Sequence, residues 1–359
     1  MVKKIAIDIS PLNDGNAVRG VGHYTHNLVN ALKKEIKSNP DYKNYQLDLI
    51  QDSRLKIEDY ALVHYPYFDP FKLSLPQKII PTIVTVHDLI PRQFKSNFPV
   101  GLKGEIRWLI QKSHLKKADY LITPSHYSKH VIADITKYPV DKIYVTPEAA
   151  TPDFKPIKDP KLLKSIKSKY KLPQKFILFV GDINWNKNLP SLIDACIYLE
   201  YPLVIVGSAA TKKDVPKHPW TADIHYTQAQ IQKHPKLIIP TGFVPEEDLP
   251  MIFNLATIYC QPSYAEGFGL PVVQALQSGT PVAYSQESCL NEIMDYNGQM
   301  FNPYSLSSLK NALITLWKNP KLRQEYSQNG IKRAQIFNWQ YTAIQTLAVY
   351  DLILKYETE

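Results

Sequence analysis

The sequence has no long hydrophobic run. None of its apolar stretches approaches the roughly 18 uninterrupted residues that a membrane-spanning helix needs. The apolar stretch at the N-terminus is short and includes Asp8, so we do not expect it to act as a signal peptide. The sequence therefore disfavours both an integral membrane protein and a secreted one.

Cysteine is also scarce. The three cysteines, Cys196, Cys260 and Cys289, are far apart and odd in number. None has the spacing of metal ligands, and no set of Ser, His and Asp includes a nucleophile elbow. We therefore expect a protein of the reducing cytoplasm with no metal site and no cofactor.

Acidic residues are outnumbered by basic ones. The chain has 33 Asp and Glu against 42 Lys and Arg, a formal charge of +9. A nucleic acid, an anionic membrane surface or a phosphorylated substrate would each complement this charge, and a solvated surface with surplus lysines would also explain it. Charge alone therefore leaves the partner open.

The 359 residues are too many for one hydrophobic core, so two domains are expected. Short apolar runs alternate with helical periods throughout, which predicts the α/β class with doubly wound, Rossmann-like sheets. A proline-flanked, lysine-rich stretch marks the boundary. We predict an N-terminal domain over residues 1–155, on which a helix at 340–359 packs back, and a C-terminal domain over residues 156–339. The domains would face each other across a cleft, with ligands at the carboxyl ends of the strands.

The most informative segment follows an apolar run at 256–260 that is typical of a buried strand. A single carboxylate, Glu266, lies in the loop after this run. Glycines in the loop would let a ligand approach the backbone, and Pro271 suits the first turn of a helix over 272–277, whose N-terminal N–H groups suit an anion. The residues that we expect to contact a ligand here are Glu266, Gly267, Phe268, Gly269, Leu270 and, one turn into the helix, Gln274. A capping role for Glu266 is the alternative.

Three other places carry candidate residues. A glycine-containing loop at 14–23, with Gly20 and Gly22, follows the first strand and opens a helix. A dinucleotide fingerprint would need a third glycine where Thr25 stands, so an NAD site is disfavoured and a simple tight turn is the alternative. His87 ends another strand, either facing a ligand or capping a turn. Lys187 begins a helix after the first strand of the second domain, where it suits a diphosphate unless it is merely solvated.

The segment 262–275 resembles the signature of the family 4 retaining glycosyltransferases, which have the GT-B fold and two acidic residues separated by seven others. Further landmarks of that family match at 86–91, 124–128, 181–188 and 242–245, and the likeness extends nearly to the chain end at Phe337-Asn338-Trp339. Two features depart from the pattern. The second acidic position is Gln274, and no arginine lies between Gly181 and Lys187.

The resemblance implies a metal-independent hexosyltransferase, closest in motif pattern to mannosyltransferases of bacterial polysaccharide assembly. In that family His87 would contact the transferred sugar, Glu266 its hydroxyls, and Lys187 the diphosphate. Gln274 would bind the ribose, backbone near Phe243 and Val244 the base, and the loop with Gly20 and Gly22 would close over the donor. Arg19 is a second candidate for the phosphates. Retention is explained there by front-face attack, in which the leaving diphosphate helps to deprotonate the acceptor.

The implied donor is a nucleotide-diphosphate sugar, GDP-mannose first and a UDP-sugar second. The implied acceptor is a glycan or a lipid-linked glycan, bound mainly by the N-terminal domain; nucleic acid is not an expected partner. Two alternatives stay open. One is a non-catalytic nucleotide-sugar-binding protein, and the other is an epimerase or phosphorylase of the same fold.

A basic helix is predicted over residues 101–118. The spacing of Leu102, Ile106, Leu109 and Ile110 predicts that they face the core while the basic side chains face solvent. The alternative is that this helix lies beside the acceptor and touches an anionic membrane peripherally, at the inner face.

Overall fold

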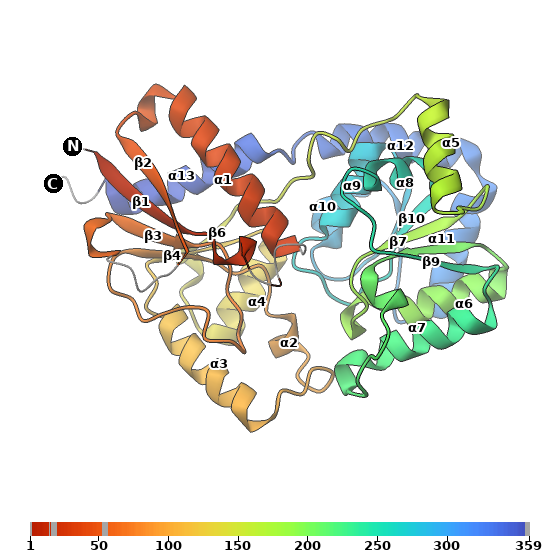
Figure 1. Ribbon diagram of the computed structural model, residues 1–359, viewed down its shortest axis with the longest axis horizontal. Helices are drawn as coiled ribbons and strands as arrows, with labels where there is room; N and C mark the ends of the chain where they lie inside the picture. Colours follow the sequence, from red (N-terminus) through yellow and green to blue (C-terminus); the bar gives the residue numbers. More distant parts are fainter. Residues whose placement is uncertain (1, 14, 16–19, 52–56, 356–359) are drawn as a thin grey trace. The chain divides into compact units, whose positions relative to one another are not determined.

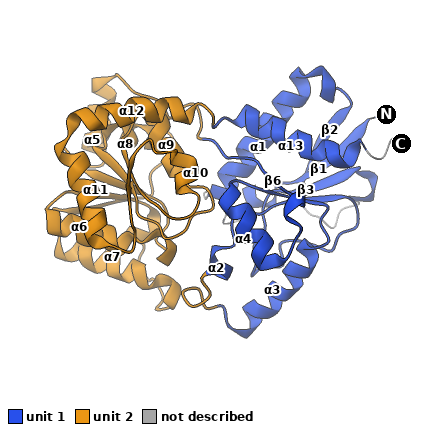
Figure 2. Cartoon of the chain, turned by 180° about the vertical axis from the view of Figure 1, so that it is seen from behind, with its two compact units in different colours: residues 1–93, 100–149, 337–359 blue, residues 94–99, 150–336 orange. Residues whose placement is uncertain are grey.

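The computed structural model describes residues 2–13, 15, 20–51 and 57–355. The chain forms two compact units, coloured separately in Figure 2. Unit 1 consists of residues 1–93, 100–149 and 337–359, and unit 2 of residues 94–99 and 150–336.

Unit 1 is built on a six-stranded parallel sheet with the order β2-β1-β3-β4-β5-β6 (Figure 1). Its strands are β1 (Lys3–Asp8), β2 (Tyr45–Ile50), β3 (Leu62–Tyr65), β4 (Thr82–Thr85), β5 (Tyr120–Thr123) and β6 (Ile143–Val145). The central strands β3 and β4 are buried along their whole length, as expected for a parallel sheet covered on both faces.

Helices cover both faces of this sheet. They are α1 (Gly20–Ser38), α2 (Ile90–Gln93), α3 (Gly101–Leu115), α4 (His126–Thr136) and α13 (Trp339–Leu354), with short 3-10 turns at Ser10–Leu12, Pro40–Tyr42, Ile57–Asp59 and Val140–Lys142. Figure 1 shows α1 and α13 side by side, and both bury apolar residues with Ile5 and Ile7 of β1. Because side chains alternate along a strand, Ala6 points to the opposite face, where α3 contributes Trp108 and α4 contributes Ile132.

Unit 2 has the same plan, with the strand order β12-β11-β10-β7-β8-β9 and every pair parallel. Its strands are β7 (Ile177–Val180), β8 (Leu203–Val206), β9 (Ile238–Gly242), β10 (Ile258–Gln261), β11 (Val282–Ser285) and β12 (Gln299–Phe301). The chain winds from β7 outward to β9, then returns to place β10 on the other side of β7. The order therefore reverses between β7 and β10, which is the switch point where ligands bind in such sheets.

The helices of unit 2 are α5 (Pro160–Lys169), α6 (Leu189–Leu199), α7 (Ala222–Lys233), α8 (Leu249–Leu255), α9 (Leu270–Ser278), α10 (Leu290–Met294), α11 (Leu306–Lys318) and α12 (Pro320–Ala334), with 3-10 turns at Trp185–Lys187, Ser208–Thr211 and Pro219–Thr221. Helices α6 and α11 pack on one face of the sheet. On the other face Phe253 of α8 packs against Tyr259 of β10, with 5.4 Å between ring centroids.

The prediction of two doubly wound α/β domains is confirmed, although several element bounds differ. The helix after β7 spans Leu189–Leu199, as its apolar period predicts, but Lys187 precedes it instead of beginning it, because Lys187 closes a 3-10 turn and Asn188 adopts a left-handed conformation (φ 51°). Helix α7 was not predicted, since its sequence is mostly polar and it fully buries only Thr227. No helix in the described part of the chain is long and apolar enough to cross a membrane.

The prediction for the basic helix is wrong in one respect. Leu102, Ile106, Leu109 and Ile110 of α3 do not face the core, and all four are exposed. The buried residues of the helix are Gly104, Trp108, Gln111 and Leu115. These four positions also recur at helical intervals, so periodicity alone does not show which of the two faces is buried. The polar Gln111 is buried because its amide accepts from the N–H of Leu75 (2.9 Å) and donates to the carbonyl of Leu75 (2.9 Å).

Candidate functional site

Two loops meet at the switch point of unit 2. One follows β7 and carries Lys187, and the other follows β10 and carries Glu266. The two strands are neighbours, with Ile258 of β10 paired to Ile177 of β7. Since the carboxyl ends of parallel strands meet at one edge of a sheet, residues 79 positions apart in sequence come together.

Lys187 and Glu266 form a bidentate ion pair. The Lys187 Nζ donates to Glu266 Oε1 at 2.9 Å and to Oε2 at 2.8 Å. The Glu266 side chain is 6% exposed and that of Lys187 is 20% exposed. A buried carboxylate requires a counter-charge, and the lysine supplies it while remaining accessible from solvent.

Two further side chains fix the orientation of Glu266. Ser263 Oγ donates to Oε1 at 2.6 Å, and Gln261 Nε2 donates to the same oxygen at 2.8 Å. The buried hydroxyl of Tyr259 in turn donates to the side-chain oxygen, Oε1, of Gln261. Sequence reasoning missed Gln261 and Ser263. The available signal was a glutamine that ends an otherwise apolar strand, because a buried amide needs partners.

The loop that bears Lys187 is also tied to the loop that bears Glu266 through the backbone. The N–H of Tyr264 donates to the carbonyl of Asn186 at 2.8 Å, and the Asn186 amide donates to the carbonyl of Ala265 at 3.0 Å. The Asn188 amide donates to the carbonyl of Pro262, and the rings of Trp185 and Tyr264 stack with centroids 4.9 Å apart. These contacts hold the two loops in a fixed position relative to each other, with the ion pair between them.

The segment Gly267–Leu270 leads directly from Glu266 into α9. The thiol of Cys289 donates to the carbonyls of Glu266 (3.3 Å) and Phe268 (3.2 Å), which anchors the loop from behind. Gly269 caps the helix in a left-handed conformation (φ 93°) that favours glycine. Pro271 lies in the first turn, as the sequence predicts, and Gly279 ends the helix.

Gln274 lies on the second turn of α9 and is partly exposed. Among the described residues, no hydrogen-bond partner of its amide is present. Phe243 and Val244 follow β9 in the same unit; Phe243 is 64% exposed and Val244 is buried. All of the predicted residues of the second domain thus belong to unit 2, and the structure brings Lys187 and Glu266 into direct contact.

His87 belongs to unit 1, at the carboxyl end of β4. Its Nδ1 lies 3.0 Å from a carboxylate oxygen of Glu148, and its Nε2 lies 3.1 Å from the carbonyl oxygen of Pro66. Both ring nitrogens therefore face acceptors, which favours the doubly protonated imidazolium. Burial acts to lower the pKa of His87, but the hydrogen bond and charge of Glu148 outweigh it and the pKa is raised.

Glu148 was not predicted as a site residue. It follows β6, and its side chain is 8% exposed. The sequence signal was a single carboxylate between Pro147 and Ala149, after a strand, which resembles the setting of Glu266 in the other unit.

Gly20 and Gly22 begin α1, the same helix that carries Tyr24. The Tyr24 ring meets the His87 ring edge-on, with centroids 4.6 Å apart. The start of α1 and His87 are therefore close neighbours within unit 1. Arg19 and most of the loop before it (residues 14 and 16–19) lie outside the described residues.

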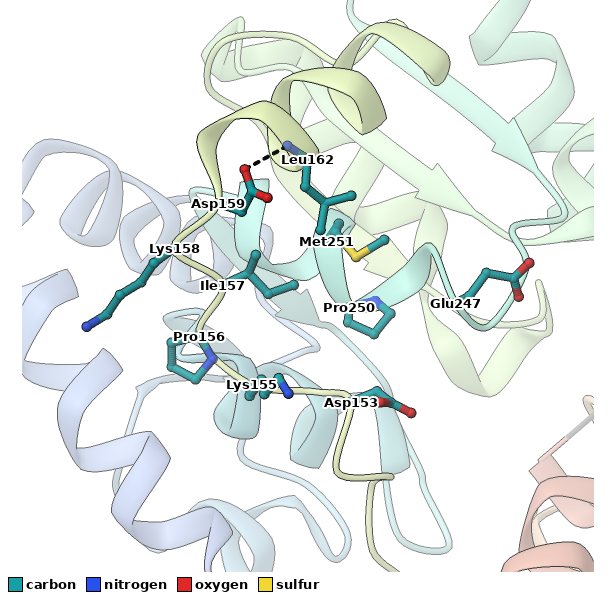
Figure 3. A pocket seen from close by; sticks show the side chains of 10 residues that line it. All are labelled: Asp153, Lys155, Pro156, Ile157, Lys158, Asp159, Leu162, Glu247, Pro250 and Met251. Atoms are coloured by element: carbon teal, nitrogen blue, oxygen red, sulfur yellow. Dashed lines mark hydrogen bonds between the residues drawn. The ribbon is translucent and has the colours of Figure 1, made fainter.

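A surface pocket of about 500 Å³ lies elsewhere in unit 2 (Figure 3). It is lined by Asp153, Lys155, Pro156, Ile157, Lys158, Asp159, Leu162, Glu247, Pro250 and Met251. None of the predicted ligand-binding residues lines it. The described residues contain no group of three or more His, Cys, Asp and Glu that could hold a metal ion.

Comparison with known proteins gives consistent matches along the chain. Residues 163–333 match the family model described as glycosyl transferases group 1, and residues 37–154 match that of glycosyltransferase family 4. The O-antigen chain mannosyltransferase B of Escherichia coli is 26% identical over 86% of this chain and 83% of its own length. The serotype-specific mannosyltransferase WbdA of Escherichia coli is 24% identical over 81% of this chain, but that match spans only 36% of WbdA.

Solved structures share the fold at low sequence identity. The sucrose-phosphate synthase of Thermosynechococcus elongatus has a TM-score of 0.75 and 19% identity, with 98% of this chain and 99% of that chain covered. The Anabaena protein Alr3699/HepE, solved in complex with UDP and glucose, has a TM-score of 0.73 and 14% identity, with 97% and 99% covered.

The contact between His87 and Glu148 predicts a pH-dependent contribution to stability. A histidine with a raised pKa stabilises the fold fully below its unfolded value, about pH 6.5, and this stability is lost as the pH rises through the folded value. We expect His87→Gln to lower the unfolding free energy by about 1.5–3 kcal/mol at pH 5.5 and by much less at pH 9. Urea denaturation at both pH values measures this, with the exposed His130→Gln as control. Equal losses at both pH values would contradict the assignment.

Proposed function

Because the chain belongs to the family 4 glycosyltransferases and carries their group 1 domain, we propose that it transfers a hexose from a nucleotide-diphosphate sugar to a glycan or lipid-linked acceptor. Its two doubly wound domains are those of the GT-B fold. GDP-mannose is the first proposed donor, since relatives matching most of this chain are named as mannosyltransferases. A UDP-sugar is the second, since a protein of the same fold binds UDP and glucose.

The observation that carries this proposal is the ion pair between Lys187 and Glu266 at the switch point. A nucleotide sugar offers a matching pair of groups, because its diphosphate is anionic and its hexose presents hydroxyls. In the proposed complex the diphosphate attracts the Lys187 ammonium, and the Glu266 carboxylate accepts hydrogen bonds from the sugar. The rigid connection of the two loops keeps both groups at a fixed separation during the exchange.

The proposed reaction proceeds with retention and without a metal. The acceptor hydroxyl attacks the anomeric carbon on the face that the diphosphate leaves, and a diphosphate oxygen takes its proton. Lys187 and the N–H groups at the start of α9 stabilise the negative charge that grows on the leaving group. The acceptor is proposed to bind unit 1. His87 is proposed to contact the transferred sugar, with one of its two ring N–H groups exchanging its present acceptor for a sugar hydroxyl.

One alternative is favoured by two departures from the family pattern. Gln274 replaces the second acidic residue of the signature, and no arginine stands between Gly181 and Lys187. Both changes would suit a protein that binds a nucleotide sugar without turning it over. Binding in the absence of turnover, with every acceptor tested, would support this second function.

The proposed function is tested first by ligand binding and transfer. A thermal-shift screen with GDP, UDP, ADP and their sugars identifies the donor, since a ligand at 100 times its Kd stabilises by about 2.7 kcal/mol. Transfer is then measured with Glu266→Gln, which is nearly isosteric and so suits a buried position with several hydrogen bonds. We expect this variant to fold and to bind the nucleoside diphosphate, but to lose at least 100-fold in transfer rate. Wild-type turnover would exclude a direct role for Glu266.

Lys187 provides a second test, because its proposed partner is the diphosphate. We expect Lys187→Met to weaken binding of the nucleoside diphosphate by about 1.5–3 kcal/mol and binding of the nucleoside hardly at all. Isothermal titration calorimetry with both ligands measures the difference. Lys171→Met, in the exposed turn after α5, is the matched control. Equal weakening of both ligands by Lys187→Met would show that Lys187 does not contact the phosphates.

Substitution of Gln274 is expected to change the affinity for the nucleoside diphosphate differently from substitution of Lys187. A glutamate at this position would accept hydrogen bonds from both hydroxyls of a ribose, whereas the amide both accepts and donates. We therefore expect Gln274→Glu to keep or raise the affinity for the nucleoside diphosphate. A tenfold loss, about 1.4 kcal/mol, would mean that Gln274 contacts a group other than a ribose diol.

A further inference from the structure

Helix α3 of unit 1 turns an apolar stripe toward solvent. Leu102 is 78% exposed, Leu109 64%, Ile106 50% and Ile110 39%. At about 100° per residue these positions fall within one sector of the helix, opposite the sector of Trp108 and Leu115. Four large aliphatic side chains on three successive turns form a continuous patch, which differs from isolated exposed leucines on an ordinary surface.

The contacts on the buried side fix this orientation. Gln111 makes two hydrogen bonds with the backbone of Leu75, and His114 Nδ1 lies 2.8 Å from the carbonyl oxygen of the same residue. The guanidinium of Arg92 lies over the Trp108 ring, 4.9 Å from its centroid. The helix cannot rotate its apolar stripe inward without breaking these contacts.

Basic residues surround the stripe. Lys103, Arg107, Lys116 and Lys117 are all exposed on α3 or directly after it. The one acidic residue of the helix, Glu105, is bound to Arg92 at 2.6 Å, so its charge is compensated. The face therefore combines aliphatic side chains with a surplus of positive charge.

The loop that packs against α3 extends this face. The Arg107 guanidinium lies 3.5 Å from the carbonyl oxygen of Phe71, which places the loop beside the helix. Two residues later Leu73 is 64% exposed, and Lys72 is exposed as well. The loop thus adds one more aliphatic side chain, while Lys72 lies 3.4 Å from Asp69 and adds no net charge.

We propose that α3 and the adjoining loop, residues 71–75, dock this protein on an anionic lipid surface. An amphipathic helix with aliphatic residues on one side and Lys and Arg around them is the arrangement that binds in the plane of a membrane interface. The aliphatic side chains enter the boundary between headgroups and acyl chains, while the basic side chains contact anionic headgroups. Figures 1 and 2 show α3 along the outer edge of unit 1.

A second copy of this chain fits the face less well. A two-fold dimer brings the same patch from both subunits together, so the basic residues of one subunit would approach the basic residues of the other. Like charges in contact are unfavourable, whereas an anionic bilayer supplies the opposite charge along the whole helix. Charge complementarity therefore favours the lipid surface.

The docking surface rests on the proposed function in one respect, because a face bound to lipid serves an acceptor that is itself lipid-linked. The docking does not depend on the donor or on the reaction. A failure of the docking proposal can therefore be distinguished from a failure of the proposed function, because vesicle binding is measured without substrate and transfer is measured with a water-soluble acceptor.

The experiment is co-sedimentation of the full-length protein with vesicles. Vesicles of phosphatidylcholine alone are compared with vesicles that also contain phosphatidylglycerol, at low and at high NaCl. We expect binding to the anionic vesicles at least tenfold stronger than to the neutral ones, and weakened by salt because exposed charges are screened. Each basic residue near such a surface strengthens binding by roughly fivefold.

Two variants test the two components of the face. Ile106→Ser with Leu109→Ser removes aliphatic side chains without touching the core, and we expect it to weaken vesicle binding at least tenfold at both salt concentrations. Lys116→Gln with Lys117→Gln should weaken only the salt-sensitive part. The control is Val140→Ser with Lys142→Gln, which changes one exposed aliphatic and one exposed basic residue elsewhere in unit 1 and should bind like the wild type. All variants should keep the wild-type melting temperature and the wild-type transfer rate to a soluble acceptor.

Equal and negligible binding of the wild type to both vesicle types would overturn the proposal. So would unchanged vesicle binding by the Ile106→Ser, Leu109→Ser variant. A wild-type dimer in analytical ultracentrifugation that this variant abolishes, without any vesicle binding, would assign the face to a second copy. Vesicle binding by a protein that transfers no sugar would leave the docking intact and reject the proposed function alone.

Discussion

A carboxylate inside a protein needs hydrogen-bond donors and a positive charge, and this requirement shapes the site in unit 2. Glu266 receives donors from Lys187, Gln261 and Ser263. Gln261 ends one strand, and Lys187 follows the neighbouring strand, so the carboxylate can be satisfied only where β7 and β10 lie side by side. The strand order that defines the fold of unit 2 thus also brings together the donors of the Glu266 carboxylate.

The same requirement explains why the two loops are tied together so closely. If Asn186 and Asn188 did not hold the loop after β7 against the loop after β10, the ammonium could move away and leave the carboxylate without its counter-charge. Unit 1 uses a related solution. There the ring of His87 meets a carboxylate, Glu148, at the carboxyl ends of β4 and β6, which lie on either side of β5. Each unit therefore contains one pair of opposite charges at the carboxyl edge of its sheet.

Much of this arrangement was predictable from local sequence. The alternation of apolar runs and helical periods predicted both doubly wound domains, and the residues after Glu266 predicted α9 with Pro271 in its first turn, although the helix begins two residues earlier and ends one residue later than predicted. The contact of Lys187 with Glu266 was not predictable in the same way, because it depends on which strands become neighbours. Gln261, Ser263 and Glu148 were missed for a related reason. Each is a polar residue whose role depends on its hydrogen-bond partners. Those partners lie on other segments of the chain or come close only when the loop has folded.

Helix α3 shows that hydrophobic periodicity alone does not identify the buried face of a helix. Two sets of residues on this helix recur at helical intervals, and the set with more aliphatic carbon is the one in solvent. The core instead takes Trp108, a glycine and an amide, because Gln111 can satisfy the backbone of Leu75 and Gly104 permits close approach to Val100. A hydrophobic period identifies a face, and the specific polar and steric complementarity of the neighbouring segments decides whether that face is covered.

The division of the chain between the two units has a consequence for biosynthesis. The hydrophobic core of unit 1 includes Ala343, Leu347 and Tyr350 of α13, which follow the whole of unit 2 in the sequence. Unit 2 is complete once residue 336 has been made. Strands β1 to β6, by contrast, are complete by residue 149, and about 190 further residues are added before α13 can pack on them. At about 5–20 residues per second this interval lasts roughly 10–40 s. During that time one face of the first sheet remains without its final cover, so the N-terminal half of the nascent chain is the part that depends most on protection from aggregation.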